Sequence, residues 1–106
     1  MLWVTEMAAN WFTRELHLQK GQAIRFFVRY GAQHQFQTGY ALGITVEKPH
    51  HEALSTEVEG IQFFITEDDV WYLDGHSLVV SCSGLEDDIR YECFADESFS
   101  DLFAIA

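Results

Sequence analysis

The segment from Ile24 to Gly43 constrains the fold most, because it has the pattern of two β-strands joined by a polar loop. One face of the first strand mixes Phe27 with two arginines, and the other is apolar, with Ile24, Phe26, Val28 and Tyr30. The loop, residues 31–35, contains a histidine flanked by two glutamines. Gly39 and Gly43, beside and within the second strand, leave room for another backbone or a ligand. We expect a functional site at or near this loop.

Composition and charge restrict the class of protein. A chain of 106 residues, 48% hydrophobic, has enough apolar residues for one domain with its own core. Seventeen acidic residues against six basic ones give a net charge of −11, which argues against binding to nucleic acid or to an anionic membrane. The sequence contains no apolar run of bilayer length, and its two cysteines fit a reducing compartment. We therefore expect a cytoplasmic protein.

Local signals divide the rest of the chain into short elements. Thr5 has the character of an N-cap, and an amphipathic helix is predicted from Thr5 to about His17. Its apolar stripe is formed by Ala8, Trp11, Phe12 and Leu16. The segments 53–58 and 61–65 predict a hairpin that turns at Glu59-Gly60.

The C-terminal half predicts one more helix and two more strands. Thr66, followed by three acids, indicates a second helix that runs to about Leu73 and ends at the turn dipeptide Asp74-Gly75. Residues 76–82 and 88–93 are the expected strands. In that hairpin Cys82 faces about Asp88, so we expect no disulfide with Cys93. These elements predict an α+β, mainly β domain with two packed mixed sheets.

The order of elements, read with its residues, resembles the HesB/IscA family, which has the A-type iron–sulfur carrier fold. The resemblance covers about residues 5–92 of a single domain, and leaves 93–106 as an acidic and aromatic tail. It is strongest in a divergent branch, the YneR-like proteins of Firmicutes. The stretches that carry it are the helix up to Leu16, Ile24–Gly31, Gly39–Gly43 and Val70–Gly75.

For the site, the resemblance implies a departure from the family. The carriers hold their cluster with three cysteines, one in the loop after the first long strand and two in a C-terminal Cys-Gly-Cys. This sequence has Gln33 beside His34 at the first position, and Ala95, two residues after Cys93, stands where the second thiolate is expected. The resemblance therefore implies no standard cluster site. Gln33, His34 and Cys93 are the candidate cofactor-binding residues, and His34 and Cys93 the candidate ligands for iron or zinc.

Two functions follow from this combination. The first is a non-enzymatic accessory or interaction protein in iron–sulfur cluster assembly or metal metabolism, with a protein partner and no bound cofactor. The alternative is a true iron–sulfur or metal carrier, in which a homodimer brings two copies of Cys93, with His34, around one ion or cluster.

Other polar clusters have structural interpretations. We expect the His50-His51 pair to be solvated, and the Asp74-Gly75-His76 segment to be a turn that leads into a strand. The acids after Thr66 favour a helix start over a calcium site. Arg25 and Arg29 share one strand face, and we expect them to pair with acids from a neighbouring strand.

Overall fold

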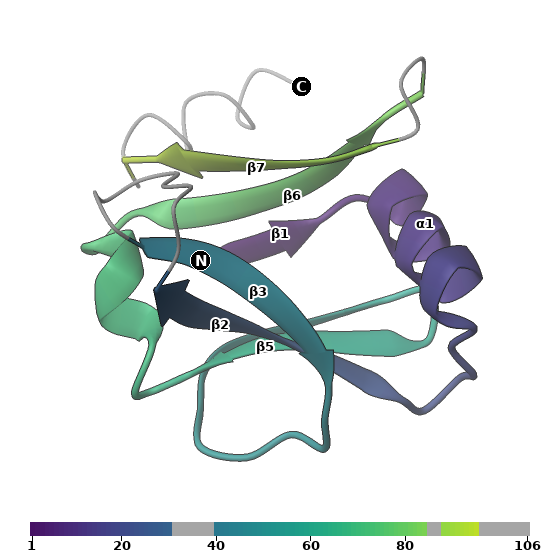
Figure 1. The fold of residues 1–106 in the computed structure, drawn as a ribbon, viewed down its shortest axis with the longest axis horizontal. Helices are drawn as coiled ribbons and strands as arrows, with labels where there is room; N and C mark the ends of the chain where they lie inside the picture. Colours follow the sequence, from purple (N-terminus) through teal and green to yellow (C-terminus); the bar gives the residue numbers. More distant parts are fainter. Residues whose placement is uncertain (31–39, 85–87, 96–106) are drawn as a thin grey trace.

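The structure is a computed structural model that describes residues 1–30, 40–84 and 88–95. Two mixed sheets face each other across the core, with a helix at one end (Figure 1). The first sheet has the order β1-β6-β7, formed by Leu2–Val4, Ser77–Ser83 and Asp88–Phe94. The second has the order β3-β2-β5-β4, formed by Tyr40–Val46, Ala23–Tyr30, Ile61–Thr66 and Glu52–Val58. The predicted fold class, mainly β with two packed mixed sheets, is confirmed.

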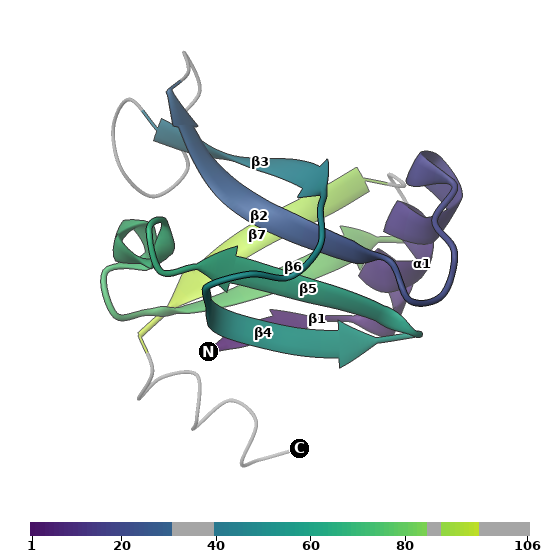
Figure 2. The ribbon, with the colours of Figure 1, turned by 90° about the horizontal axis from the view of Figure 1, so that it is seen from below.

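The two helical segments lie at opposite ends of the sheets. The α-helix α1, Glu6–Leu16, and the one-turn 3₁₀-helix η1, Val70–Leu73, flank the β-structure in both views (Figures 1 and 2). In the part of the chain that the structure describes, no helix is long and apolar enough to cross a membrane.

The helix α1 forms where the sequence predicts it. The Thr5 hydroxyl accepts a hydrogen bond from the Ala8 amide at 3.1 Å, and His17 ends the helix in the left-handed region at φ 52°. The helix buries Ala8, Ala9 and Phe12, whereas Leu16 is 38% exposed, so the predicted stripe is wrong at its last position. Leu16 lies in the last turn, and Leu18 enters the core just beyond it.

The core is an aromatic cluster that joins the helix to both sheets. Phe12 of α1 contacts Phe26 of β2 and Phe63 of β5, with ring centroids 6.1 and 5.7 Å apart. Tyr91 of β7 meets Phe26 edge-on at 6.1 Å. Phe12, Phe26 and Phe63 have no exposed surface, and aromatic pairs such as the edge-on Phe12–Phe26 contact add to the stabilisation that burial gives.

The N-terminal residues form a strand that the sequence does not predict. Residues 2–4 pair in parallel with β6, with Leu2 opposite Leu78 and Val4 opposite Val80. Leu2 and Val4 are buried while Trp3 points outward, which is the alternation of a strand with one covered face. Three residues are too few for this alternation to be recognised without the partner strand.

The predicted start of the second helix is wrong. Thr66 is the last residue of β5 and does not cap a helix, and the helical segment is one 3₁₀ turn from Val70 to Leu73. Asp69, the residue before that turn, makes no side-chain capping bond. Its carboxylate instead binds Arg25 of β2 at 2.8 Å, so a tertiary contact competes with the helix start.

The β6–β7 hairpin differs from its prediction by one residue. Cys82 lies opposite Ile89 and not Asp88, while Cys93 lies opposite Leu78. Cys82 and Cys93 form no disulfide, as predicted. The turn residues 85–87 lie outside the described part of the chain.

Candidate functional site

The sequence-predicted site falls largely outside the described residues. Gln33, His34 and Gly39 belong to 31–39, which the structure does not describe. Cys93 is half-buried near the end of β7, where it packs against the core opposite Leu78. Within 1–30, 40–84 and 88–95, no three histidine, cysteine or acidic side chains form a group that could hold a metal ion. The ligand roles of His34 and Cys93 remain predictions.

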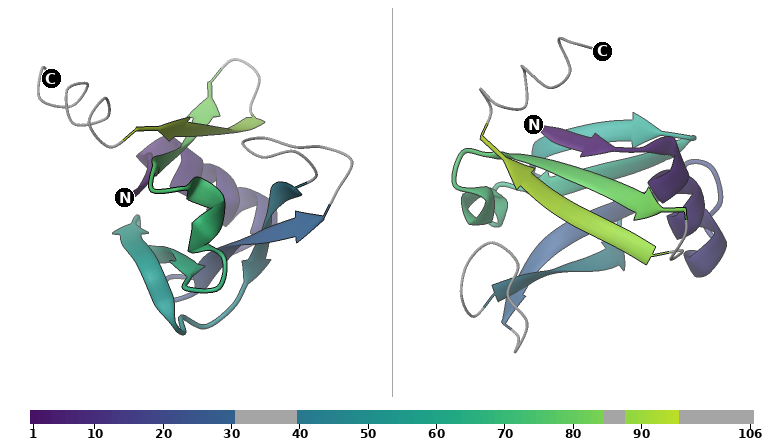
Figure 3. Two further views of the ribbon diagram at one scale, coloured as in Figure 1. Left: turned by 90° about the vertical axis from the view of Figure 1, so that its left-hand side faces the viewer. Right: turned by 90° about the horizontal axis from the view of Figure 1, so that it is seen from above.

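Several elements that the sequence analysis associates with the candidate site nevertheless end or begin at one end of the molecule. The end of β2, the start of β3, η1 and the end of β7 lie at the same end of the two sheets (Figures 1 and 3). Cys93, near the end of β7, and the end of β2 are thus brought to this end from distant parts of the chain.

Trp71 in η1 is an exposed aromatic side chain at this end. It is 47% exposed, although its ring contacts Tyr40 edge-on with centroids 5.3 Å apart. Its neighbour Tyr72 is fully buried, and the Tyr72 hydroxyl donates a hydrogen bond to the carbonyl of Tyr40 at 3.1 Å. Tyr72 therefore fixes η1 to the start of β3, and this contact places Trp71 on the surface.

Hydrogen bonds hold both ends of η1. Before it, Asp69 forms the ion pair with Arg25, and after it the Asp74 amide donates to the carbonyl of Trp71 at 3.0 Å, with Asp74 in the left-handed region. His76 Nδ1 lies 3.1 Å from the carbonyl oxygen of Leu73 and 2.9 Å from that of Asp74. Because carbonyl oxygens only accept, Nδ1 carries the hydrogen. The predicted turn leading into a strand is confirmed.

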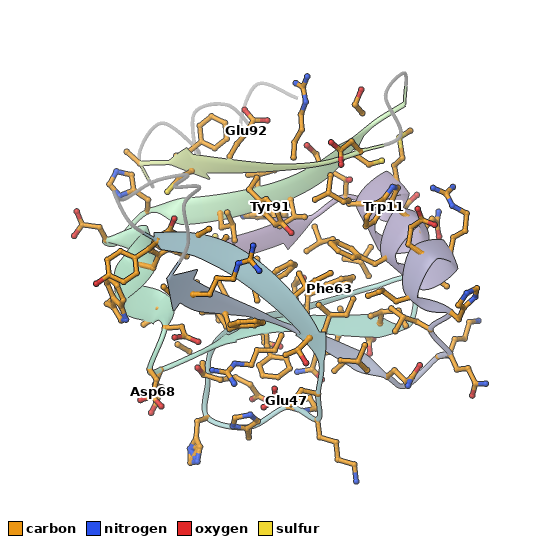
Figure 4. The ribbon with its side chains drawn as sticks, in the orientation of Figure 1. Trp11, Glu47, Phe63, Asp68, Tyr91 and Glu92 are labelled. Atoms are coloured by element: carbon orange, nitrogen blue, oxygen red, sulfur yellow. The ribbon has the colours of Figure 1, made fainter. Side chains whose placement is uncertain are left out.

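Acidic side chains flank Trp71 on both sides along the chain. Glu67, Asp68 and Asp74 are exposed, whereas Asp69 is engaged with Arg25. Figure 4 shows Asp68 pointing away from the sheets. From Pro49 to Ile89 the sequence contains no lysine or arginine, so these carboxylates have no basic neighbour along the chain.

A second polar cluster surrounds Arg25 on the outer face of the four-stranded sheet. Arg25 binds Asp69 at 2.8 Å and Glu47 at 3.4 Å. The predicted pairing with acids is confirmed for Arg25, although its partners lie just beyond β5 and β3 and not within them, while Arg29 is exposed. Glu47 is hydrogen-bonded to His50. This bond, aided by the charge of Arg25 and opposed by burial, lowers the pKa of the Glu47 carboxyl.

The cluster fastens the β3–β4 loop over the sheet. The ring of His50 packs edge-on against Phe64 of β5 at 5.9 Å, and Phe64 is completely buried although it lies on the outer face. His50 and His51 are both exposed, so the prediction of a solvated pair holds. Figure 4 shows Glu47 in this loop, far from Tyr91 and Glu92 of β7.

The close approach expected at Gly43 is an internal one. Phe27 lies directly opposite Gly43, and a Cβ at that glycine would be 2.6 Å from the Cζ atom of Phe27. The ring of the neighbouring strand thus fills the space in which the sequence suggests another backbone or a ligand.

Comparison with known proteins finds several that are similar in sequence to this chain. No protein-family model matches the chain. A Bacillus subtilis protein, "Pyruvate dehydrogenase inhibitor", is 43% identical over 89 residues, which cover 84% of this chain and 94% of that protein. Uncharacterized proteins of Staphylococcus saprophyticus and Staphylococcus aureus are 33% and 32% identical, and the matches cover 89% and 93% of those proteins.

A solved structure confirms the fold that the resemblance implies. Escherichia coli SufA, described as involved in the biosynthesis of iron–sulfur clusters, superposes with a TM-score of 0.57 over 86% of this chain and 78% of SufA. The two sequences are 19% identical, so the comparison shows a common HesB/IscA-like fold and nothing about activity.

Proposed function

Because the chain belongs to the same family as the Bacillus subtilis pyruvate dehydrogenase inhibitor, we propose that it is a non-enzymatic protein that binds a pyruvate dehydrogenase and lowers its activity. The observation that carries the proposal is 43% identity over nearly the whole length of that relative. The proposal keeps the non-enzymatic interaction role that the sequence predicts. It differs in the partner, which is a pyruvate dehydrogenase and not a protein of iron–sulfur cluster assembly or metal metabolism. The action would take place in the cytoplasm.

The surface around η1 supports a role in binding. Trp71 is a half-exposed tryptophan with exposed carboxylates close to it in the chain, and tryptophan is enriched among the residues that dominate binding energy. Inhibition by binding needs such a surface and no catalytic group of the inhibitor's own.

Steady-state kinetics of pyruvate dehydrogenase from the organism that encodes this chain test the proposal. We expect NADH formation to fall in a saturable manner as purified chain is added, and another dehydrogenase to keep its rate. The Bacillus subtilis relative with the enzyme of its own organism is the positive control. An unchanged rate with excess chain, together with no binding in a pull-down, would refute the proposal.

A second candidate, the metal or cluster carrier, is favoured by the position of Cys93. Cys93, a cysteine that forms no disulfide, lies near the end of β7, at the end of the molecule where β2 also ends (Figure 1). The chain has two cysteines in all, so it does not fit a three-thiolate site within one copy. A homodimer with two copies of Cys93 and His34 is the form this candidate requires.

Metal and sulfide analysis of anaerobically purified protein decides on this candidate. Iron and sulfide present in the wild type and in Cys82→Ser, but lost in Cys93→Ser, would support the carrier. Protein without iron or sulfide in all three forms would dismiss it and leave the inhibitor proposal untouched.

A further inference from the structure

We propose that Trp71 and the exposed carboxylates of Glu67, Asp68 and Asp74 form the surface with which the chain docks onto a positively charged patch of its target enzyme. The inference rests on the proposed function and deepens it, because it names the docking surface and the chemistry of the partner. We call these four residues the η1 surface.

Trp71 has the geometry of a binding anchor. The indole is supported on one side by Tyr40 at 5.3 Å and on another by Tyr72 at 6.0 Å, and it still exposes 47% of its area. A side chain already held in place loses little conformational freedom on binding, so more of the energy of its burial appears as affinity. Large aromatic residues of this kind dominate measured binding energies.

The carboxylates define the partner's charge. The three exposed acids of the η1 surface lie within a stretch of 41 residues, Pro49–Ile89, that contains no lysine or arginine. The whole chain carries a charge of −11. Such a surface repels acidic partners and accelerates encounter with basic ones, so the partner patch must be rich in lysine or arginine around an apolar slot for the indole.

Another exposed tryptophan provides the comparison. Trp3 is 40% exposed on β1, beside a groove of about 270 Å³ that is lined by Met1, Leu2, Trp3, Leu54, Ser55 and Thr56. The residues that line this groove include no acid, and their charged group is the Met1 ammonium, which is opposite in sign to the carboxylates of the η1 surface. Trp3 therefore matches Trp71 in residue type and exposure but not in charge.

Binding of the labelled chain to pyruvate dehydrogenase tests the surface. We expect Trp71→Ala to weaken binding about 30-fold, the loss typical of a dominant contact, and Trp3→Ala to weaken it less than about threefold. Wild type that does not bind would overturn both the proposed function and this inference. Equal binding of Trp71→Ala and wild type would overturn the inference alone.

A charge variant tests the surface without touching its packing. Asp68→Asn with Asp74→Asn is expected to slow association severalfold at ~0.1 M salt, and the difference is expected to shrink at ~1 M salt, where charges are screened within about 3 Å. The matched control is Glu57→Gln with Glu59→Gln, two exposed acids of the β4–β5 hairpin, whose turn lies at the opposite end of the molecule from η1 (Figure 2). Equal slowing by both double variants would mean that net charge and not this surface steers the encounter, and would overturn the inference.

Discussion

At the scale of single residues, Gly43 is the described glycine at which an added Cβ would make the closest contact. A Cβ there would lie 2.6 Å from Cζ of Phe27, too close for any stable contact. We expect Gly43→Ala to lower the free energy of unfolding by about 1–3 kcal/mol, because Phe27 must leave its place against β3. Urea-induced unfolding measures this loss.

The control for this substitution is Gly84→Ala. At Gly84 the nearest atom to an added Cβ is the sulfur of Met7 at 3.8 Å, an ordinary contact. We expect Gly84→Ala to change the free energy of unfolding by less than about 0.5 kcal/mol. Similar losses in both variants would show that the Phe27–Gly43 contact has no special cost.

Tyr91 makes stability depend on pH in the alkaline range. Burial, and secondarily the charge of Asp88, raise the pKa of the Tyr91 phenol to about 12. In the unfolded chain the pKa of tyrosine is about 10, so the unfolded state loses this proton first. The contribution of the protonated Tyr91 phenol to the free energy of unfolding is therefore fully present below about pH 10, and it is lost as the pH rises from about 10 to 12.

Substitution of Tyr91 by phenylalanine removes this dependence. Urea unfolding of wild type and Tyr91→Phe between pH 9 and pH 12 is expected to show a smaller alkaline loss in the variant. A loss of the same size in both proteins would assign it to other groups.

At the scale of elements, the cap of α1 offers a local test. The Thr5 hydroxyl accepts from the Ala8 amide at 3.1 Å, so Thr5→Ala leaves that amide without its partner. We expect a loss of about 1 kcal/mol in thermal or urea unfolding, while Thr5→Ser, which keeps a hydroxyl, stays near the wild type. Equal losses would mean that the methyl group of Thr5 matters and the cap does not.

Elements specified by neighbouring residues were predictable, and those specified by distant ones were not. The cap and apolar spacing of α1 lie within one short segment, as does the turn at Glu59-Gly60, where both residues have positive φ. In contrast, β1 exists because β6 pairs with it, and η1 is shortened because Arg25 binds Asp69. Those partners are far away in sequence, and local signals do not reveal them.

The same distinction applies to the candidate site. The pairing of Arg25 was predictable, because a chain with many acidic residues places a carboxylate near most positions of a sheet. The contrast between Trp71 and Tyr72 was not, because adjacent aromatic residues give no sign of which one is buried. The hydrogen bond from Tyr72 to Tyr40 decides this, and it joins segments 32 residues apart.

At the scale of the whole molecule, the charge of −11 predicts how salt acts on stability. Seventeen acids against six bases repel one another in the compact state more than in the extended one. We expect the midpoint of thermal unfolding to rise as sodium chloride increases from ~0.01 M to ~0.3 M, because the repulsion is screened. A falling midpoint would mean that ion pairs such as Arg25–Asp69 outweigh the repulsion.

The parallel pairing of β1 with β6 also sets an order on the ribosome. Residues 2–4 are synthesised before their partners around Leu78, with four other strands and both helical segments between them, and the Met1 ammonium donates a hydrogen bond to Ser77 across 76 residues. The β2–β3 and β4–β5 hairpins close over short loops before β6 has been made, whereas β1 waits without a neighbouring strand. We therefore expect the β1–β6–β7 sheet to be completed late in folding, because its parallel pair joins residues that are far apart in the chain.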